Sequence, residues 1–312
     1  MQPSPDSHRP KLAVLAGPTG VGKTELALGL AERFGAEIIS ADSMQVYRYM
    51  DIGTAKPSSE EQARTPHHLI DLIDPDQDFD VAAYLELARP LIEKMSHAKV
   101  PILVVGGTGF YLRSLLRGIF EGPGRDQKIR SRLKEEALSK GREALHARLA
   151  KTDPIAAGRV HPHDLFRVIR ALEVYELTGR PISSYQAEHG LSDTPYDYML
   201  LSLNLPRQEL YARIASRTRQ MFASGLFEEV EGLLARGYSP QLKPLQAIGY
   251  KQVVACLFGE LSQAEAEAEV IKQTCRYAKR QLTWLRSQPR LVWHEGGLDE
   301  SLQKTVADFW AG

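Results

Sequence analysis

Eight consecutive residues near the start of the chain could hold a phosphate group. They fit the pattern G-x-x-x-x-G-K-[ST] and lie between an apolar run at 11–16 and a helical pattern at 23–34. Glycines let backbone N–H groups turn inward around an anionic oxygen, and the helix N-terminus adds its dipole. The lysine adds a point charge, and the threonine hydroxyl could bind Mg²⁺. The pattern fits a nucleoside triphosphate and a bare diphosphate equally well. The residues are Gly17, Pro18, Thr19, Gly20, Val21, Gly22, Lys23 and Thr24.

An aspartate follows the second expected strand, at a place where ligands bind in doubly wound sheets. Asp42 comes two residues after the run 36–40, near the carboxyl end of that strand. Its carboxylate could accept a proton from an attacking nucleophile, or hold Mg²⁺ through water. An aspartate at this position could instead be only the N-cap of a following helix. Because a phosphate loop should lie beside it, we favour the catalytic interpretation.

A glycine-rich turn follows a third expected strand, at 100–105. Residues 106–111, GGTGFY, would let a substrate approach the backbone, and Thr108 would offer a hydroxyl to the same crevice. Tight packing of a strand against a helix would also explain the glycines, but not Thr108. In the polar loop 51–57, Lys56 could contact phosphate, although its spacing is equally consistent with an ordinary turn.

Basic side chains gather at three places in the second half of the chain. The largest group shares one helix face, and no acidic residue occurs between 270 and 290. A solvated surface would be expected to carry acidic partners, so contact with a phosphate backbone is the better interpretation. Together with the phosphate loop, the three groups suggest a large polyanionic substrate. They are Lys272, Arg276, Lys279 and Arg280; Arg213, Arg217 and Arg219; and Arg167 with Arg170.

Strands alternate with helices around these residues, which predicts an α/β fold with a parallel sheet. The region 126–184 is instead charged and helical, so we expect an inserted all-helical domain. The expected domains are a core formed by 10–120 and 195–312, with C-terminal helices, and an insertion at 121–194. Expected strands are 11–16, 36–40, 100–105, 199–205 and 290–294, and expected helices are 23–34, 81–96, 207–223, 226–236, 246–258 and 262–287.

The 312 residues carry 39 Lys and Arg against 39 Asp and Glu, and a zero balance alone would discourage a nucleic-acid partner. The charge is unevenly distributed, however. Residues 1–124 carry 12 basic and 16 acidic side chains, which leaves 27 and 23 for the remainder. Positive charge is therefore local, in the half that holds the basic groups.

Other sequence features exclude several classes of protein. The longest apolar run, 102–106, is strand-sized, and the polar N-terminus lacks the apolar segment of a signal peptide. We therefore expect no membrane partner and a cytoplasmic location. Cys256 and Cys275 form no metal-binding or disulfide pattern.

An ordered set of segments resembles the tRNA dimethylallyltransferase (tRNA isopentenyltransferase) family of bacterial type. The phosphate loop alone is shared with many NTPases and kinases, but the full set is specific and spans the chain. The resemblance implies a P-loop NTPase-like parallel sheet flanked by helices. The segments are 17–24, 40–45, 51–57, 106–109, 161–164, 167–173, 247–252 and 279–286.

The resemblance also implies an activity and its residues. A dimethylallyl group would pass from dimethylallyl diphosphate to N6 of the adenine 3′ of the anticodon, with Mg²⁺ as cofactor. We expect a monomer that binds the tRNA anticodon arm. The catalytic residues would be Asp42, Thr108 and Arg217, with the phosphate loop on the diphosphate and Thr24 on the metal. The tRNA contacts would be Asp42, Ser43, Met44, Gln45, Thr108, Arg130, Phe166, Arg167, Val168, Ile169, Arg170, Ala247, Ile248, Gly249, Tyr250, Lys251, Gln252, Lys279 and Arg280.

Two other functions compete with this one. A P-loop kinase of small molecules would share the strand, loop, helix and acidic second-strand end. An RNA-binding NTPase switch would hydrolyse nucleotide without transferring a group. A switch should carry a strand of four apolar residues ending in Asp, and no convincing example is present, which counts modestly against it.

Overall fold

The structure is a computed structural model that describes residues 9–119, 122–189 and 194–311. The polar N-terminal segment 1–8 and Glu121, the first residue of the predicted insertion, lie outside the described residues. The chain divides into two compact units. One comprises the residues up to Leu116 and those from Pro195 onward, and the other comprises Arg117–Thr194.

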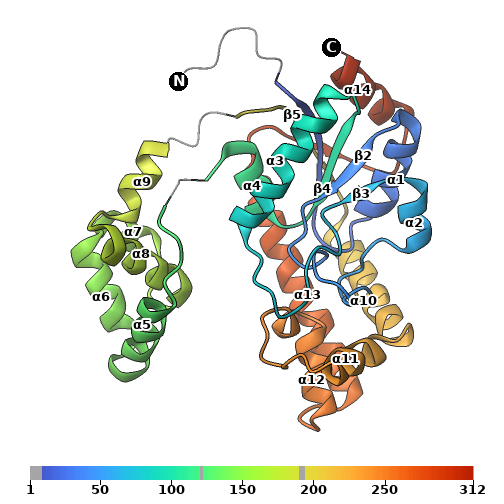
Figure 1. The fold of residues 1–312 in the computed structure, drawn as a ribbon. Helices are drawn as coiled ribbons and strands as arrows, with labels where there is room; N and C mark the ends of the chain where they lie inside the picture. Colours follow the sequence, from blue (N-terminus) through green and yellow to red (C-terminus); the bar gives the residue numbers. More distant parts are fainter. Residues whose placement is uncertain (1–8, 120–121, 190–193, 312) are drawn as a thin grey trace. The chain divides into compact units, whose positions relative to one another are not determined.

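A parallel β-sheet forms the centre of the first unit, which confirms the predicted fold class (Figure 1). In the described residues the strand order is β3-β2-β4-β1-β5-β6, and each neighbouring pair is parallel. After its first residue, Lys11, strand β1 is apolar and buried from Leu12 to Ala16, as expected for a strand covered on both faces. The strands are β1 (Lys11–Ala16), β2 (Glu37–Ser40), β3 (His67–His68), β4 (Ile102–Gly106), β5 (Asp197–Leu203) and β6 (Leu291–His294).

Helices cover both faces of this sheet (Figure 1). Leu30, Ile214 and Leu302 bring α1, α10 and α14 into one core cluster with alternate residues of β1. On the opposite face lie α3 and α4. The helices are α1 (Lys23–Phe34), α3 (Val81–His97), α4 (Gly109–Arg117), α10 (Arg207–Ala223) and α14 (Glu300–Ala311).

Helix α10 and three further helices gather where the carboxyl ends of β1, β2 and β4 lie, and α2 (Ser59–Arg64) precedes β3 (Figure 1). The expected helix at 246–258 is interrupted, because Gly249 adopts φ 97° and ψ −66°, which non-glycine residues rarely adopt. A 3₁₀ turn, Pro244–Gln246, therefore precedes the helix proper. The four helices are α10, α11 (Leu226–Ala235), α12 (Tyr250–Leu257) and α13 (Gln263–Arg286).

The second unit contains only helices among its described residues, as predicted for the insertion. Leu133, Leu149 and Val168 belong to its separate apolar core. The buried Asp153 joins two of its helices, because one carboxylate oxygen caps Ala156 N and the other accepts from Ser183 N, each at 2.9 Å. The helices are α5 (Gln127–Lys140), α6 (Arg142–Thr152), α7 (Pro154–Arg159), α8 (Leu165–Thr178) and α9 (Ile182–His189).

Within the described ranges, no helix is both long enough and apolar enough to cross a bilayer.

Candidate active site

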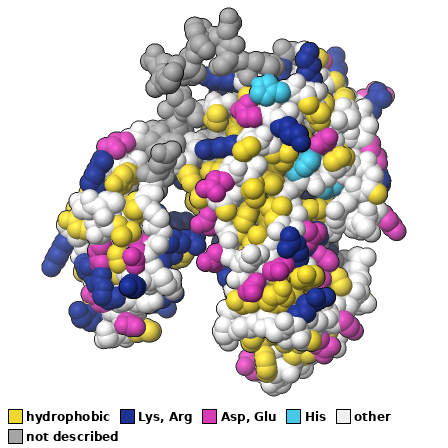
Figure 2. Space-filling model, in the orientation of Figure 1, with side chains coloured by type: hydrophobic (Ala, Val, Ile, Leu, Met, Phe, Trp, Pro, Cys, Tyr) yellow, Lys and Arg dark blue, Asp and Glu magenta, His cyan; other side chains and the backbone are white. Residues whose placement is uncertain are grey.

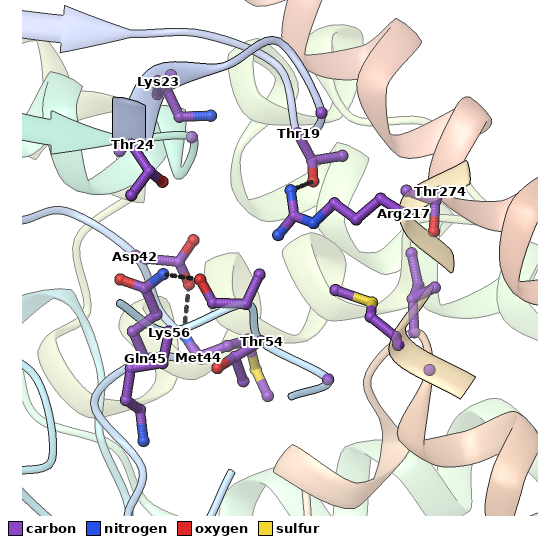
Figure 3. A pocket seen from close by; sticks show the side chains of 18 of the residues that line it. Thr19, Lys23, Thr24, Asp42, Met44, Gln45, Thr54, Lys56, Arg217 and Thr274 are labelled. Atoms are coloured by element: carbon purple, nitrogen blue, oxygen red, sulfur yellow. Dashed lines mark hydrogen bonds between the residues drawn. The ribbon is translucent and has the colours of Figure 1, made fainter. Parts of the chain in front are cut away.

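A cleft of about 980 Å³ opens at the carboxyl edge of the sheet, entirely within the first unit (Figure 3). The phosphate loop and the residues after β2 line it, as do the loop 53–57, α10 and α13. Ligands of open α/β sheets bind at this edge, where the strand order reverses. The cleft is therefore the candidate active site.

The phosphate loop has the conformation that its glycines predict. Gly20 and Gly22 have φ angles of 83° and 101°, and Gly22 leads directly into α1. Lys23 Nζ donates to the carbonyl oxygens of Gly17, at 3.0 Å, and Pro18, at 2.9 Å. The loop therefore holds its ammonium group beside the helix N-terminus.

Two cations face the cleft without an acidic partner in salt-bridge contact among the described residues. Arg217 Nη1 donates to Thr19 Oγ1 at 3.4 Å, so the guanidinium reaches the phosphate loop from α10 (Figure 3). Removal from water and the nearby Arg217 charge lower the pKa of Lys23 to about 8. Burial likewise lowers the pKa of Arg217. The site therefore disfavours its own positive charges, which an incoming anion would relieve.

Asp42 lies in the same cleft, and its negative charge acts to raise the pKa of both cations. Its Oδ1 accepts from Met44 N at 2.8 Å, within an irregular segment (Figure 3). No helix begins after Asp42, so the N-cap interpretation is wrong. Among the described residues, no hydrogen bond occupies its other oxygen, which could accept a proton.

Thr108 joins two loops at the sheet edge. Its Oγ1 accepts from Ser43 N at 3.2 Å, and it hydrogen-bonds the Tyr277 side chain. Burial, with the Asp42 charge adding to it, raises the pKa of Tyr277 to about 12, so this phenol stays protonated. Thr108 is absent from the residues that line the cleft. It thus holds Ser43 in place.

Close packing explains the glycines beside Thr108. A Cβ built on Gly106 would lie 2.3 Å from the Ala41 carbonyl oxygen, and one on Gly109 would lie 2.7 Å from the Trp284 ring. Packing against a helix is therefore correct for Gly109, which lies against α13, whereas Gly106 packs against the segment that follows β2.

Gln281 links the two loops that flank the cleft, a role that no local sequence pattern predicted. Its Oε1 accepts from Thr19 N at 3.0 Å, while its Nε2 donates to Gly107 O at 2.8 Å. It comes from α13, far away in sequence, and only its place among the matched segments could have drawn attention to it.

Gln45 and Lys56 are held by internal contacts. Gln45 accepts from Ser40 Oγ at 3.0 Å and donates to Ala55 O at 3.2 Å. The Lys56 side chain is only 2% exposed, and its Nζ is shared between the carboxylates of Asp51 and Asp71 at 2.5 and 2.6 Å. Lys56 therefore stabilises its own loop, and the idea that it contacts phosphate is wrong.

Several candidate RNA contacts in the first unit are buried. Tyr250 and Gln252 are 1% and 8% exposed, and Gln252 Oε1 accepts from Gly249 N at 2.9 Å. Both side chains are largely withdrawn from solvent, although Tyr250 is among the residues that line the cleft, so their contact with RNA stays a prediction. Lys251 is exposed, and Ala247 and Ile248 line the cleft with Gly249.

The basic face of α13 is less uniform than its sequence suggested. Lys272 pairs with Glu269 at 2.8 Å, so the argument that this stretch lacks acidic partners fails for Lys272. Glu269 lies one helical turn before Lys272 and directly before the acid-free interval. Lys279 and Arg280 are exposed, and Arg280 also lines the cleft beside Tyr277.

The helical unit holds its arginines in a different way. Glu173 is fully buried, and it accepts from Arg130 Nε and Arg170 Nη1 at 2.7 Å each. Although burial would raise the pKa of this carboxyl, the two arginines lower it to about 2. Figure 2 shows basic and acidic side chains standing close together on this unit.

The other residues of this unit that were predicted to contact tRNA fall into two groups, buried and exposed. Val168 and Ile169 are 0% and 5% exposed and belong to the apolar core. Their side chains are therefore not available to RNA, and the predicted contact is wrong for them. Phe166 is exposed, with the Arg130 guanidinium over its ring, and Arg167 is exposed with an ion pair to Asp164.

The cleft offers few protein ligands for a metal ion. Thr24 and Asp42 both line it, one with a hydroxyl and the other with a carboxylate. In the described part of the chain, no three His, Cys, Asp or Glu side chains gather as a metal site. Magnesium is typically held by one or two protein oxygens together with substrate phosphates and water, so these residues fit Mg²⁺.

Comparison with protein families gives two matches. The family described as IPP transferase matches residues 45–288, and the isopentenyl transferase family matches residues 10–73. The tRNA dimethylallyltransferase of Geobacter sulfurreducens is 53% identical over 286 residues, which cover 91% of this chain and 92% of the relative. The corresponding protein of Desulfosudis oleivorans is 50% identical over 285 residues, covering 91% of each chain.

Solved structures agree with these relatives. A tRNA isopentenylpyrophosphate transferase from Bacillus halodurans aligns with a TM-score of 0.72 and 39% identity, covering 97% of both chains. A eukaryotic dimethylallyltransferase acting on tRNA aligns with a TM-score of 0.79 and 28% identity, covering 96% of this chain and 77% of that one. The fold is thus P-loop NTPase-like, as predicted.

Proposed function

The chain belongs to the tRNA dimethylallyltransferase family, and we propose that it transfers a dimethylallyl group from dimethylallyl diphosphate to tRNA. The acceptor is N6 of the adenine 3′ of the anticodon, and the products are N6-isopentenyladenosine and diphosphate. The observation that carries this proposal is the meeting of Lys23, Arg217 and Asp42 in one cleft. The two cations can stabilise the departing diphosphate, and the carboxylate can accept the proton that N6 loses.

The proposed bond changes balance around these residues. The adenine N6 lone pair forms a bond to C1 of the dimethylallyl group, and the C1–O bond breaks with its electron pair on the diphosphate. The N6 proton passes to the Asp42 carboxylate. Because the N6 lone pair is delocalised into the adenine ring, this amine is a poor nucleophile, and a positioned base should help it.

The phosphate loop supplies the stabilisation that the leaving group needs. Its backbone amides, Lys23 and Arg217 offer positive charge where negative charge develops on the diphosphate. The Thr24 hydroxyl, with the Asp42 carboxylate nearby, would hold Mg²⁺, which as a Lewis acid supplies further charge stabilisation. We assign Thr108 a supporting role, since it fixes Ser43 beside Asp42.

The acceptor adenine must leave its stack to reach the cleft, at a cost of a few kcal/mol. We propose that Ser43, Met44, Gln45 and the backbone of residues 247–249, all of which line the cleft, contact it there. Lys251, Lys279 and Arg280 would contact the phosphates of the anticodon arm. From the helical unit, we assign RNA contact to the exposed Phe166 and Arg167, with Arg130 and Arg170 held beside them. A monomeric state and a cytoplasmic location stay predictions.

A single incubation tests the function. The protein is mixed with bulk tRNA, labelled dimethylallyl diphosphate and Mg²⁺, the RNA is digested, and the nucleosides are separated. We expect label in N6-prenylated adenosine, and an absence of label in RNA would refute the proposal. ATP consumption that depends on a small alcohol would favour a kinase. RNA-stimulated NTP hydrolysis would favour a switch.

The role of Asp42 has its own test. Asp42→Asn keeps an oxygen for the Met44 N–H and removes the base, and Asp42→Ala removes both. Both variants should abolish transfer and bind tRNA with nearly unchanged affinity. Turnover retained in Asp42→Asn would exclude Asp42 as the base.

A further inference from the structure

The loop at residues 49–57 forms one wall of the cleft and has an unfavourable backbone. Tyr49 and Ala55 have φ angles of 66° and 48°, in the left-handed region that non-glycine residues rarely occupy. Such residues persist only where surrounding contacts fix them. Residues 53–57 line the cleft, and Figure 3 shows Thr54 on the side away from Lys23 and Thr19.

One carboxylate outside the cleft fixes this loop. Glu229, in the first turn of α11, accepts backbone N–H bonds from Asp51 at 2.8 Å, Ile52 at 2.7 Å and Gly53 at 3.1 Å. Three successive amides thus converge on one side chain, in the arrangement that binds anions elsewhere. Its Oε1 also accepts from the Tyr250 hydroxyl at 2.6 Å. Glu229 is absent from the residues that line the cleft.

Tyr250 packs against the same loop from α12. A Cβ built on Gly53 would lie 2.5 Å from the Tyr250 ring, so the ring lies directly against the loop backbone. Burial and the Glu229 carboxylate raise the pKa of Tyr250 well above its usual value, so the phenol remains a donor. The loop is therefore held between α11 and α12.

The held loop in turn orients a residue of the cleft. Ala55 O accepts from Gln45 Nε2, and Gln45 Oε1 accepts from Ser40 Oγ at the end of β2. An amide bonded at both ends keeps one orientation, because rotating it by half a turn would break both bonds. Contacts run from Glu229 through the loop to Gln45.

We infer that Glu229 is a positioning residue that fixes the 51–55 loop, and through it Gln45, for the acceptor adenine. The inference rests on the proposed function, because it assigns the Gln45 side of the cleft to the RNA. The phosphate loop lies on a different wall, and the described contacts of Glu229 do not reach it. Loss of the Glu229 carboxylate should therefore impair use of tRNA and spare binding of the diphosphate substrate.

Three variants separate this role from a general loss of structure. Glu229→Gln places an amide where four donors converge, and Tyr250→Phe removes one donor. Glu228→Gln, on the exposed face of the same helical turn, is the matched control for loss of charge. Each full-length variant is assayed for kcat and KM with tRNA and for the Kd of dimethylallyl diphosphate. Hydrogen exchange is followed at the amides of Asp51, Ile52 and Gly53.

Glu229→Gln should lower kcat/KM for tRNA by about tenfold or more, because an NH₂ group replaces one of the two oxygens that accept from the four donors. Its three loop amides should exchange faster, and the donor Kd should stay within about twofold of the wild-type value. Tyr250→Phe should show a smaller loss, and Glu228→Gln none. The inference is overturned if Glu229→Gln matches Glu228→Gln, or if donor binding falls as much as tRNA use does. Should the wild-type protein transfer no prenyl group, the proposed function fails, and amide exchange alone still decides whether Glu229 holds the loop.

Discussion

The cleft and the helical unit each bring two basic side chains together, but they treat the charge in opposite ways. In the cleft, Lys23 and Arg217 have lowered pKa values and no carboxylate in salt-bridge contact among the described residues. In the helical unit, Arg130 and Arg170 share the buried Glu173, whose pKa is lowered to about 2. The Lys23 and Arg217 charges raise the energy of the unliganded protein, whereas Arg130 and Arg170 already share a buried carboxylate.

The difference separates a site built for an anion from a site built for structure. Cations that lie close together without a partner gain most when a polyanion arrives, whereas a satisfied pair gains little. Glu173 also accepts from Asp126 N at 2.9 Å, and Arg170 donates to Pro123 O at 2.8 Å. The helical network thus fixes the start of its own unit, and RNA would meet a surface already arranged.

The largest effect is expected from Glu173→Gln. Removing the carboxylate leaves two arginines without their buried partner, and the free energy of unfolding should fall by about 3 kcal/mol. Glu188→Gln removes an exposed pair with Arg180 and should cost under about 1 kcal/mol. All three tryptophans, Trp284, Trp293 and Trp310, lie in the first unit. In Glu173→Gln, loss of helical circular dichroism should therefore precede the change in tryptophan fluorescence; coincident transitions would contradict the assignment.

The same network predicts an acid transition. Because the folded pKa of Glu173 is lowered from 4.5 to about 2, its stabilising contribution is complete above about pH 4.5. That contribution should disappear as the pH falls from about 4.5 to about 2. Acid unfolding should therefore begin in the helical unit. In Glu173→Gln, the stability of this unit should depend less on pH.

A large effect on catalysis is expected from Arg217→Gln. Transfer should fall by about 10²–10³-fold, as when one donor to a developing anion is removed. Thermal stability should not decrease, because Arg217 is among the causes that lower the Lys23 pKa. Arg213→Gln, on the same helix and paired with Glu209, is the control and should lose less than about tenfold. A marked fall in melting temperature for Arg217→Gln would mean that this arginine is structural.

A moderate effect is expected from pH. The Lys23 pKa of about 8 in the free protein means that the ammonium loses its proton above that pH. Since the diphosphate substrate binds the charged form, its affinity should be level below pH 8 and fall by about tenfold per pH unit above it. Calorimetric titration between pH 7 and 10 measures this slope. In Arg217→Gln the break should move to higher pH, and an unmoved break would show that the two cations do not interact.

The smallest effect is expected on the surface of α13. Neutralising Lys279 and Arg280 should weaken tRNA binding and reduce the dependence of log K on log salt by about one unit for each residue. Lys272→Gln should change the slope less, because Glu269 already pairs with Lys272. Equal slopes for all variants would mean that this face does not meet RNA.

Local patterns were enough to predict the sheet and the phosphate loop. The strand at 11–16, the loop and α1 are contiguous, so one short stretch specifies both structure and chemistry. The two-residue β3 has no periodicity to detect, and α2 and α14 were not predicted. The helix expected at 246–258 failed at Gly249, whose backbone angles a periodic pattern does not reveal.

Contacts between distant segments account for what the sequence did not reveal in the site. Glu173, Glu229 and Gln281 act on residues that lie far from them along the chain, so no local spacing marks them. Lys272 was expected to lack an acidic partner because the acid-free interval begins at residue 270, whereas the partner of Lys272 is Glu269. The segment 247–252 predicted RNA contact for Tyr250, Lys251 and Gln252 alike, but only Lys251 is exposed.

The order of segments in the sheet has a consequence for synthesis on the ribosome. Strand β1 is made first, but it pairs with β5, which follows the whole helical unit in the chain. At roughly 5–20 residues per second, β1 waits on the order of 10–40 s for that neighbour. The helical unit is a continuous segment with its own core, so it can fold during this interval. Gln281 emerges later still, and the phosphate loop therefore acquires its final partner only near the end of translation.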